Sequence, residues 1–120
     1  MTLEGDVAAI PDAETFDAVV GRFILQFVPD PVATLRSVAR VLRPHGIVAI
    51  QEVAWTPARA ANSHLPLWSA CASVVHEAIR RAGARTDPGL TLHRVFQEAT
   101  LPAPKMTFDM KIGASRELIL

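Results

Sequence analysis

The pattern of apolar and polar residues predicts a strand, a helix and a second strand in the first half of the chain. Residues 16–20 are mostly apolar and rich in valine, which is typical of a buried strand. Apolar residues then recur at helical spacing over residues 32–42, after an Asp30-Pro31 pair that favours a helix start. Residues 47–50 are all apolar and predict a second strand. A helix between two apolar strands indicates a parallel sheet, so we expect an α/β fold.

The second half is predicted to be mostly helical. Residues 54–65 contain proline, asparagine and serine and are expected to form a loop. Residues 66–81 carry an apolar stripe that includes Cys71, and we expect this stripe to face inward, with the cysteine as a small buried hydrophobe. Another Asp-Pro pair predicts a helix over residues 88–99. Residues 105–112 alternate between polar and apolar side chains, which predicts a half-exposed strand at a sheet edge.

The amino-acid composition argues against several classes of function. The chain has 120 residues, half of them hydrophobic, so one domain with a core is expected. Its 12 basic residues balance 12 acidic ones, which argues against holding nucleic acid or an anionic membrane by bulk charge. No apolar stretch has the length of a membrane span, and the start does not resemble a signal peptide. We therefore expect a soluble, cytoplasmic protein.

Metal and disulfide chemistry are not expected. The single cysteine excludes an internal disulfide, and the four histidines lack the spacing of a metal site. Ligands of open α/β sheets bind outside the carboxyl ends of the strands. Those ends are Gly21-Arg22 and Glu52-Val53.

Several short motifs occur in an order and at a spacing that are typical of one family. They are Gly5-Asp6 with Ile10-Pro11, Phe16-Asp17-Ala18-Val19-Val20, Asp30-Pro31 with Leu35, and Arg40-Val41-Leu42-Arg43-Pro44-His45-Gly46. Together they resemble the later part of the class I S-adenosylmethionine (SAM)-dependent methyltransferase domain, of methyltransferase type 11. The resemblance implies a partial Rossmann-like methyltransferase sheet with flanking helices, lacking the N-terminal strands.

The resemblance also implies how the chain is divided. Residues 1–120 would form a single partial methyltransferase domain. Within it, residues 1–53 would be the Rossmann-like half, residues 54–100 a helical lid and substrate region, and residues 101–120 a terminal strand and tail.

The cofactor implied by the resemblance is SAM. The aspartate matching Asp6 would accept a hydrogen bond from the adenine amino group, and the backbone N–H of Val7 would reach the ring. The backbone of Gly21 and Arg22 would line the methionine part of the cofactor, with Gln26 facing the same pocket.

A small-molecule methyl acceptor is also implied. Trp55 and Trp68 flank the region where related enzymes place their substrate lid. They are candidates for an aromatic substrate wall, although packing in the core is an equal alternative. No residue is assigned as a general base.

Two departures from the family pattern open an alternative function. His45 stands where the family usually has glycine, which predicts a non-glycine residue in a turn with positive φ. The six glycines include no Gly-x-Gly loop, and the acidic residue that would hold the ribose hydroxyls is missing too. The alternative is a truncated, non-catalytic methyltransferase-fold domain that serves as an interaction or dimerisation module.

The same departures bear on partners. The strand over residues 16–20 would have an open edge where a missing strand belongs, and it has no lysine or proline to discourage pairing. We therefore expect a homo-oligomer, or a partner that supplies the missing strands.

Overall fold

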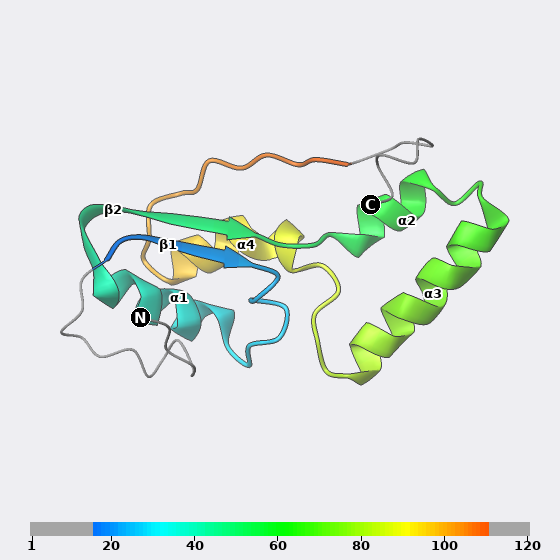
Figure 1. Ribbon diagram of the computed structural model, residues 1–120, viewed down its shortest axis with the longest axis horizontal. Helices are drawn as coiled ribbons and strands as arrows, with labels where there is room; N and C mark the ends of the chain where they lie inside the picture. The colour runs from blue at the N-terminus through cyan, green and yellow to red at the C-terminus, as the bar shows by residue number, and fades with distance from the viewer. Residues whose placement is uncertain (1–15, 111–120) are drawn as a thin grey trace.

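The computed structural model describes residues 16–110. Two strands and four helices follow one another as β1 (Phe16–Arg22), α1 (Pro31–Val41), β2 (Leu42–Gln51), α2 (Trp55–Ala61), α3 (Pro66–Arg81) and α4 (Pro88–Glu98). Figure 1 shows β1 and β2 side by side, with α1 and α4 beside them and α3 set apart at the other end. The chain has a mixed α/β architecture, as its sequence predicts.

The sheet consists of β1 and β2, which pair in parallel. Helix α1 connects them, so the strand–helix–strand prediction for residues 16–50 is confirmed. In the register, Ala18 lies beside Ile47 and Gly21 beside Ile50, and the pairing is irregular between Phe16 and Ala18. A two-stranded sheet is compatible with a partial methyltransferase fold.

Helix α1 covers one face of this sheet together with α4. The side chain of Asp30 caps α1 by accepting a hydrogen bond from the Ala33 N–H at 3.0 Å, as its sequence position predicts. Leu35 of α1 is fully buried against Val95 and Phe96 of α4, and Val48 and Ile50 of β2 pack on the same cluster. This small core positions the strand ends.

The opposite face of the sheet is open. Side chains alternate along a strand, so Val20 and Ile47 point away from the core that Val48 and Ile50 contact. Val20 is 77% exposed and Ile47 is 64% exposed. An apolar sheet face therefore lies in contact with solvent.

His45 adopts the backbone conformation that the sequence predicts. Its φ is +67°, in the left-handed region that histidine tolerates better than most residues. The next residue must be glycine for another reason, since a Cβ on Gly46 would lie 2.9 Å from the carbonyl oxygen of Arg43. His45 and Gly46 together thus form the turn that leads into the part of β2 that pairs with β1.

The prediction of a loop over residues 54–65 is wrong for its first half, where α2 forms. Helix α2 has no cap within its own segment, because its N-cap residue is Ala54. Asp87 supplies the cap from a distant loop and accepts hydrogen bonds from the Thr56 N–H at 2.7 Å and the Thr56 hydroxyl at 2.8 Å. For the same reason Asp87 does not cap α4, the helix that it precedes.

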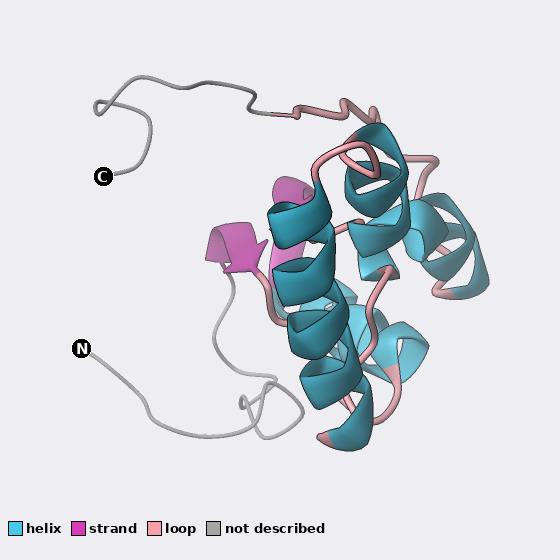
Figure 2. Ribbon diagram, turned by 90° about the vertical axis from the view of Figure 1, so that its right-hand side faces the viewer, coloured by secondary structure: helices cyan, strands magenta, loops and turns pink. Residues whose placement is uncertain are grey.

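Helices α3 and α4 form where the sequence predicts them, but the inward stripe of α3 is wrong. Ala72 is the buried residue of α3, whereas Cys71 is exposed, Leu67 is 80% exposed and Val74 is 71% exposed. In Figure 2, which looks at the end of the molecule where α3 lies, α3 is the long helix in the foreground. An apolar stripe is buried only where another element packs on it, and among the described elements the main contact of α3 is with the short helix α2.

The predicted strand over residues 105–112 is also wrong as far as residue 110; the last two residues lie outside the described part. Residues 102–110 form an extended segment without helix or strand. No backbone hydrogen bond within residues 16–110 joins this segment to β2. Alternation determines which side chains share a face, but it does not supply a partner strand.

None of the helices within residues 16–110 is long and apolar enough to cross a membrane.

Candidate functional site

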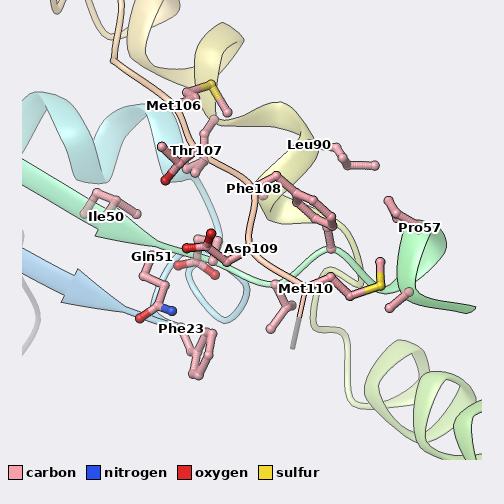
Figure 3. Close-up of a pocket in the computed structure, with 16 residues that line it drawn as sticks. Phe23, Ile50, Gln51, Pro57, Leu90, Met106, Thr107, Phe108, Asp109 and Met110 are labelled. Carbon is pink, nitrogen blue, oxygen red and sulfur yellow. The ribbon is translucent and has the colours of Figure 1, made fainter. Parts of the chain in front are cut away.

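A cavity of about 910 Å³ lies where β2 ends. Its walls come from the end of β2 and the following residues, from Phe23 after β1, from α2, from the start of α4 and from the segment 106–110. In Figure 3 the segment with Thr107 and Phe108 crosses in front of α4, with Leu90 and Pro57 to one side. The cavity therefore lies at the carboxyl end of the parallel strands, where α/β proteins bind ligands.

The lining is mainly apolar, with a few polar groups. Ile50, Leu90, Leu92, Met106 and Phe108 are among the apolar residues. Within the described residues 16–110, the polar side chains of the lining are those of Gln51, Glu52, Thr107 and Asp109, and none of its residues is a lysine, arginine or histidine. Such a surface suits a small molecule with an apolar body and a hydrogen-bond donor.

Glu52 is the most constrained polar residue of the wall. Its Oε1 accepts hydrogen bonds from the Ile24 N–H at 2.9 Å and from the Leu25 N–H at 2.6 Å. Its Oε2 is buried and has no hydrogen-bond partner. Burial raises the pKa of Glu52, and the hydrogen bonds from the backbone of the turn oppose this effect without cancelling it.

Phe23, which also lines the cavity, has an unusual backbone conformation. Its φ is +55°, which a bulky residue rarely adopts, and its N–H donates to the Gln51 carbonyl oxygen at 2.9 Å. The guanidinium of Arg22 lies 4.9 Å from the centre of the Phe23 ring. Backbone strain of this kind is common at binding sites, where surrounding contacts hold it.

A network of hydrogen bonds fixes the turn between β1 and α1. Arg85 donates from its backbone N–H to the Gln26 carbonyl oxygen at 2.9 Å. Its guanidinium donates to the carbonyl oxygens of Val28 at 2.5 Å and Pro29 at 2.8 Å. The turn that bonds to Glu52 is thereby tied to the loop before α4.

The loop before α4 also holds α2 against the cavity. The Gly89 N–H donates to the Val53 carbonyl oxygen at 2.9 Å, and the Trp55 N–H donates to the Thr86 carbonyl oxygen at 3.3 Å. Burial acts to raise the pKa of Asp87, but the hydrogen bonds from Thr56 and Thr86 outweigh it and lower this pKa below its usual value. Asp87 is therefore a charged cap that connects two walls of the cavity.

The residues implied by the resemblance lie elsewhere. Asp6 and Val7 are outside the described residues. Gly21, Arg22 and Gln26 follow one another at the end of β1 and in the turn after it, but none of the three lines the cavity. Their assignment to the cofactor stays a prediction.

The local geometry of these residues does not form a cradle for SAM. A Cβ on Gly21 would lie 2.9 Å from the Cδ1 of Ile50, so the space above this glycine is filled by a side chain of the neighbouring strand. The Gln26 side chain is 7% exposed and donates to the Phe23 carbonyl oxygen at 3.2 Å. Because Ile50 covers Gly21 and the Gln26 amide is hydrogen-bonded within its own turn, these residues offer few groups to contact a ligand.

Trp55 and Trp68 are both half-buried, near the starts of α2 and α3. Neither lines the cavity, although Pro57 and Ala58 of α2 do. The aromatic wall of the cavity is made by Phe23 and Phe108 instead. A substrate role for the two tryptophans remains a prediction.

Sequence reasoning missed Glu52 as a site residue. It identified Glu52-Val53 as a strand end but gave the carboxylate no role. The signal was an acidic residue two positions after the apolar run over residues 47–50. Within residues 16–110, no group of three or more histidine, cysteine, aspartate or glutamate residues could hold a metal ion.

Comparison with known proteins gives one match. The model of a family described as a methyltransferase domain matches residues 1–50, which include β1, α1 and all but the last residue of β2. No curated protein and no solved structure matches the chain.

Proposed function

We propose, from the class I SAM-dependent methyltransferase-like domain in residues 1–50, that the protein transfers a methyl group to a small-molecule acceptor held in the cavity at the end of β2. The position of the cavity carries this proposal. It lies beyond the carboxyl end of the parallel pair, and its volume of about 910 Å³ suits a small molecule.

The methyl donor implied by the family is SAM. The described residues do not fit it well, because Gly21 is covered by Ile50 and Gln26 is bonded within its own turn. We therefore derive no step of the reaction through the cofactor. We expect SAM to bind this chain weakly, with a dissociation constant above about 100 μM. Titration calorimetry measures it, and a low-micromolar constant would contradict the expectation.

Methyl transfer tests the function directly. The protein would be incubated at high SAM concentration with an equimolar mixture of small amines, phenols and thiols, and methylated products would be measured by mass spectrometry. We expect protein-dependent product. Ala58→Phe should reduce it, because Ala58 lines the cavity and a phenyl group there would occupy part of the space that an acceptor needs.

The matched control is Ala60→Phe. Ala60 lies on the same helix, is exposed and does not line the cavity. This variant should form product as the wild type does. Absence of product from the wild-type protein, or equal loss in both variants, would count against the proposed function.

A second candidate function is an interaction or dimerisation module, and the open sheet face favours it. Val20 and Ile47 are largely exposed on that face, and β1 has no partner on its outer edge within residues 16–110. Edges and apolar faces of this kind recruit other chains. The proposed partner is a second copy of the chain.

Sedimentation at tens of micromolar tests this candidate. We expect a dimer that Val20→Glu converts to monomer, because a carboxylate on the shared face would be desolvated. Val74→Glu is the control, since Val74 is equally exposed on α3. A wild-type species of 13.0 kDa would contradict dimerisation.

A further inference from the structure

The carboxylate of Glu52 has one satisfied and one unsatisfied oxygen. Oε1 accepts two backbone N–H groups, whereas the buried Oε2 has no partner. Buried polar atoms in folded proteins are nearly always hydrogen-bonded, and an exception is often explained by a ligand or by catalysis. Because Glu52 also lines the cavity, a donor bound there would complete its hydrogen bonding.

The charges of the wall indicate what kind of donor would bind. Among the lining residues within 16–110, Glu52 and Asp109 are the charged ones, and both are acidic. Arg22 stacks on Phe23 but is not part of the lining. A cation placed in the cavity would therefore be attracted by two carboxylates, and an anion would be repelled by both.

The rest of the wall indicates the body of the ligand. Aliphatic and aromatic side chains come from every element that borders the cavity: Ile50 from β2, Leu90 from α4, and Phe108 and Met110 from the segment 106–110. Figure 3 shows Phe108 and Met110 on the same side of β2 as Leu90 and Pro57. A hydrocarbon or aromatic group would lose contact with water here.

We propose that the cavity binds a small amine with an apolar body, whose ammonium group donates to Glu52. As a statement about the methyl acceptor, this inference rests on the proposed function, and the ammonium would first have to lose a proton so that its nitrogen has a lone pair to attack the methyl group. As a statement about binding, the inference does not rest on that function. The nitrogen would be held at Glu52 by a charge-assisted hydrogen bond, with Asp109 adding to the attraction.

Because Oε2 of Glu52 is buried, a ligand reaches it only when part of the cavity wall moves, and the segment 106–110 is the wall with the fewest bonds to the described fold. Within residues 16–110, no backbone hydrogen bond holds residues 102–110 to the rest of the fold. Met106 and Phe108 remain 46% and 59% exposed, so this wall is held by partial side-chain contacts. Elements with few buried contacts open at low free-energy cost.

Three probes of one shape separate charge from shape. They are 2-phenylethylamine, 2-phenylethanol and phenylacetate, which at neutral pH are cationic, neutral and anionic. Dissociation constants would be measured by NMR, following the amide signals of Ile24 and Leu25, which donate to Glu52. We expect the amine to bind at least about tenfold more tightly than the alcohol and to shift both amide signals, with the anion weakest.

Glu52→Gln tests the residue. Glutamine keeps one acceptor oxygen for the turn but loses the charge, so most of the tenfold preference for the amine should be lost, with Asp109 left to attract the ammonium. Glu98→Gln makes the same chemical change on an exposed part of α4 outside the lining, and it should leave the tenfold preference intact.

Several results would overturn the inference. They are absence of binding by any of the probes, equal binding of amine and alcohol by the wild type, and a preference that survives undiminished in Glu52→Gln. The comparison of amine and alcohol binding by the wild-type protein tests the inference even if Glu52→Gln does not fold. Amine binding without methylated product would overturn the proposed function and leave the binding site in place. Methylation of phenols or thiols alone would support the proposed function and overturn the amine as its methyl acceptor.

Discussion

Helices α1 and α3 begin in similar ways but are used differently. Both start at a proline, and both carry an apolar stripe that the sequence predicts to face inward. Leu35, Val38 and Val41 of α1 are buried, with Leu35 packed against α4 and β2, whereas of the 16 residues of α3 Ala72 alone is buried. The difference lies in what each helix meets, because a stripe is buried only by an opposing surface.

The two regions meet at the cavity. One wall belongs to the packed region, formed by β2 and α4, and another belongs to α2, which contacts α3. The hydrogen bonds of the Asp87 loop connect these walls. The site thus depends on a stable region for its carboxylate and on a loosely packed region for part of its shape.

The largest expected effect comes from comparing a leucine-to-alanine substitution in α1 with the same substitution in α3. Leu35→Ala should cost about 2–5 kcal/mol in the free energy of unfolding, because this side chain is fully buried and would leave a cavity. Leu67→Ala should change it by less than about 0.5 kcal/mol, because Leu67 is 80% exposed on α3. Urea denaturation measures both.

The contradictory outcome would be informative. A large loss in Leu67→Ala that depends on protein concentration would mean that α3 is buried against a second chain in solution. The contrast between the regions would then describe a single chain and not the assembled protein.

A second, smaller contrast concerns the two capping aspartates. Asp30→Ala and Asp87→Ala should each cost about 0.5–2 kcal/mol of helix stability, through loss of bonds to Ala33 and to Thr56. We expect the first to lower the global free energy of unfolding and the second to increase hydrogen exchange mainly at the start of α2. Asp87→Asn, which keeps an acceptor oxygen, should have the smaller effect.

The pKa of Asp87 predicts how the stability of the start of α2 changes with pH. Because its pKa is lower in the folded protein than its usual 3.8, Asp87 contributes stability above that value. This contribution is lost as the pH falls through the folded pKa. Protection of the Thr56 amide from exchange, relative to the intrinsic exchange rate at each pH, should fall on acidification, and unchanged protection would contradict the assigned role.

The sequence predicted elements better than it predicted their environment. Residues 16–20, 47–50 and 66–81 lie in the expected strands and helix, because periodicity and Asp-Pro or proline starts act locally. The loop prediction over residues 54–65 failed because the cap of α2 comes from Asp87, which is 31 residues from Thr56. No local pattern reveals such a partner.

The candidate site shows the same limit. The strand end at Glu52 was visible in the sequence, but the two N–H groups that hold its carboxylate come from the turn at residues 24–25. The wall at 106–110 was predicted as a strand, because its alternation was read without knowing whether an edge was available. Burial and pairing are properties of the whole fold.

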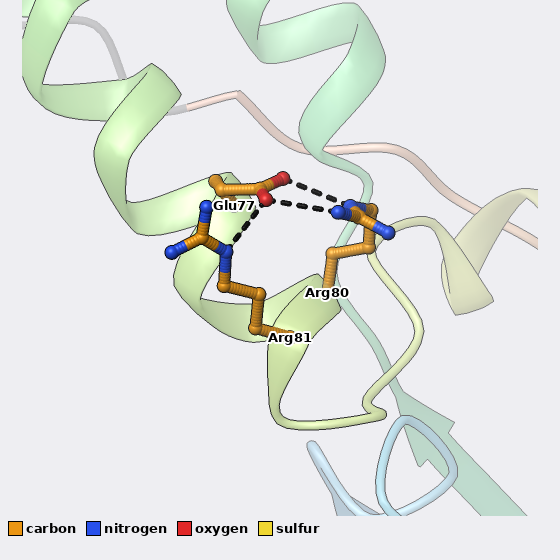
Figure 4. Close-up of polar contacts among 3 residues, drawn as sticks. All are labelled: Glu77, Arg80 and Arg81. Atoms are coloured by element: carbon orange, nitrogen blue, oxygen red, sulfur yellow. Dashed lines mark hydrogen bonds and ion pairs between the residues drawn. The ribbon is translucent and has the colours of Figure 1, made fainter.

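The smallest expected effect tests α3 by itself. In Figure 4, Glu77 faces Arg80 and Arg81 on the last turns of this helix. The Glu77 carboxylate accepts two hydrogen bonds from Arg80, at 2.8 and 2.9 Å, and one from Arg81 at 2.8 Å. These bonds, those from Arg80 first, lower the pKa of Glu77 from 4.5 to about 2.

Because the folded pKa is depressed, the ion pairs stabilise α3 above pH 4.5 and are lost as the pH falls towards 2. Solvent screens these exposed groups, so the gain in stability is small, and about 1 M salt should raise the pKa towards its usual value. A carboxyl-carbon NMR titration measures this pKa. Arg80→Gln should raise it more than Arg81→Gln, and equal shifts in the two variants would contradict the two-bond geometry of Arg80. If α3 were covered by a second chain, the pKa of Glu77 would instead depend on protein concentration, and the contrast with α1 would no longer hold in solution.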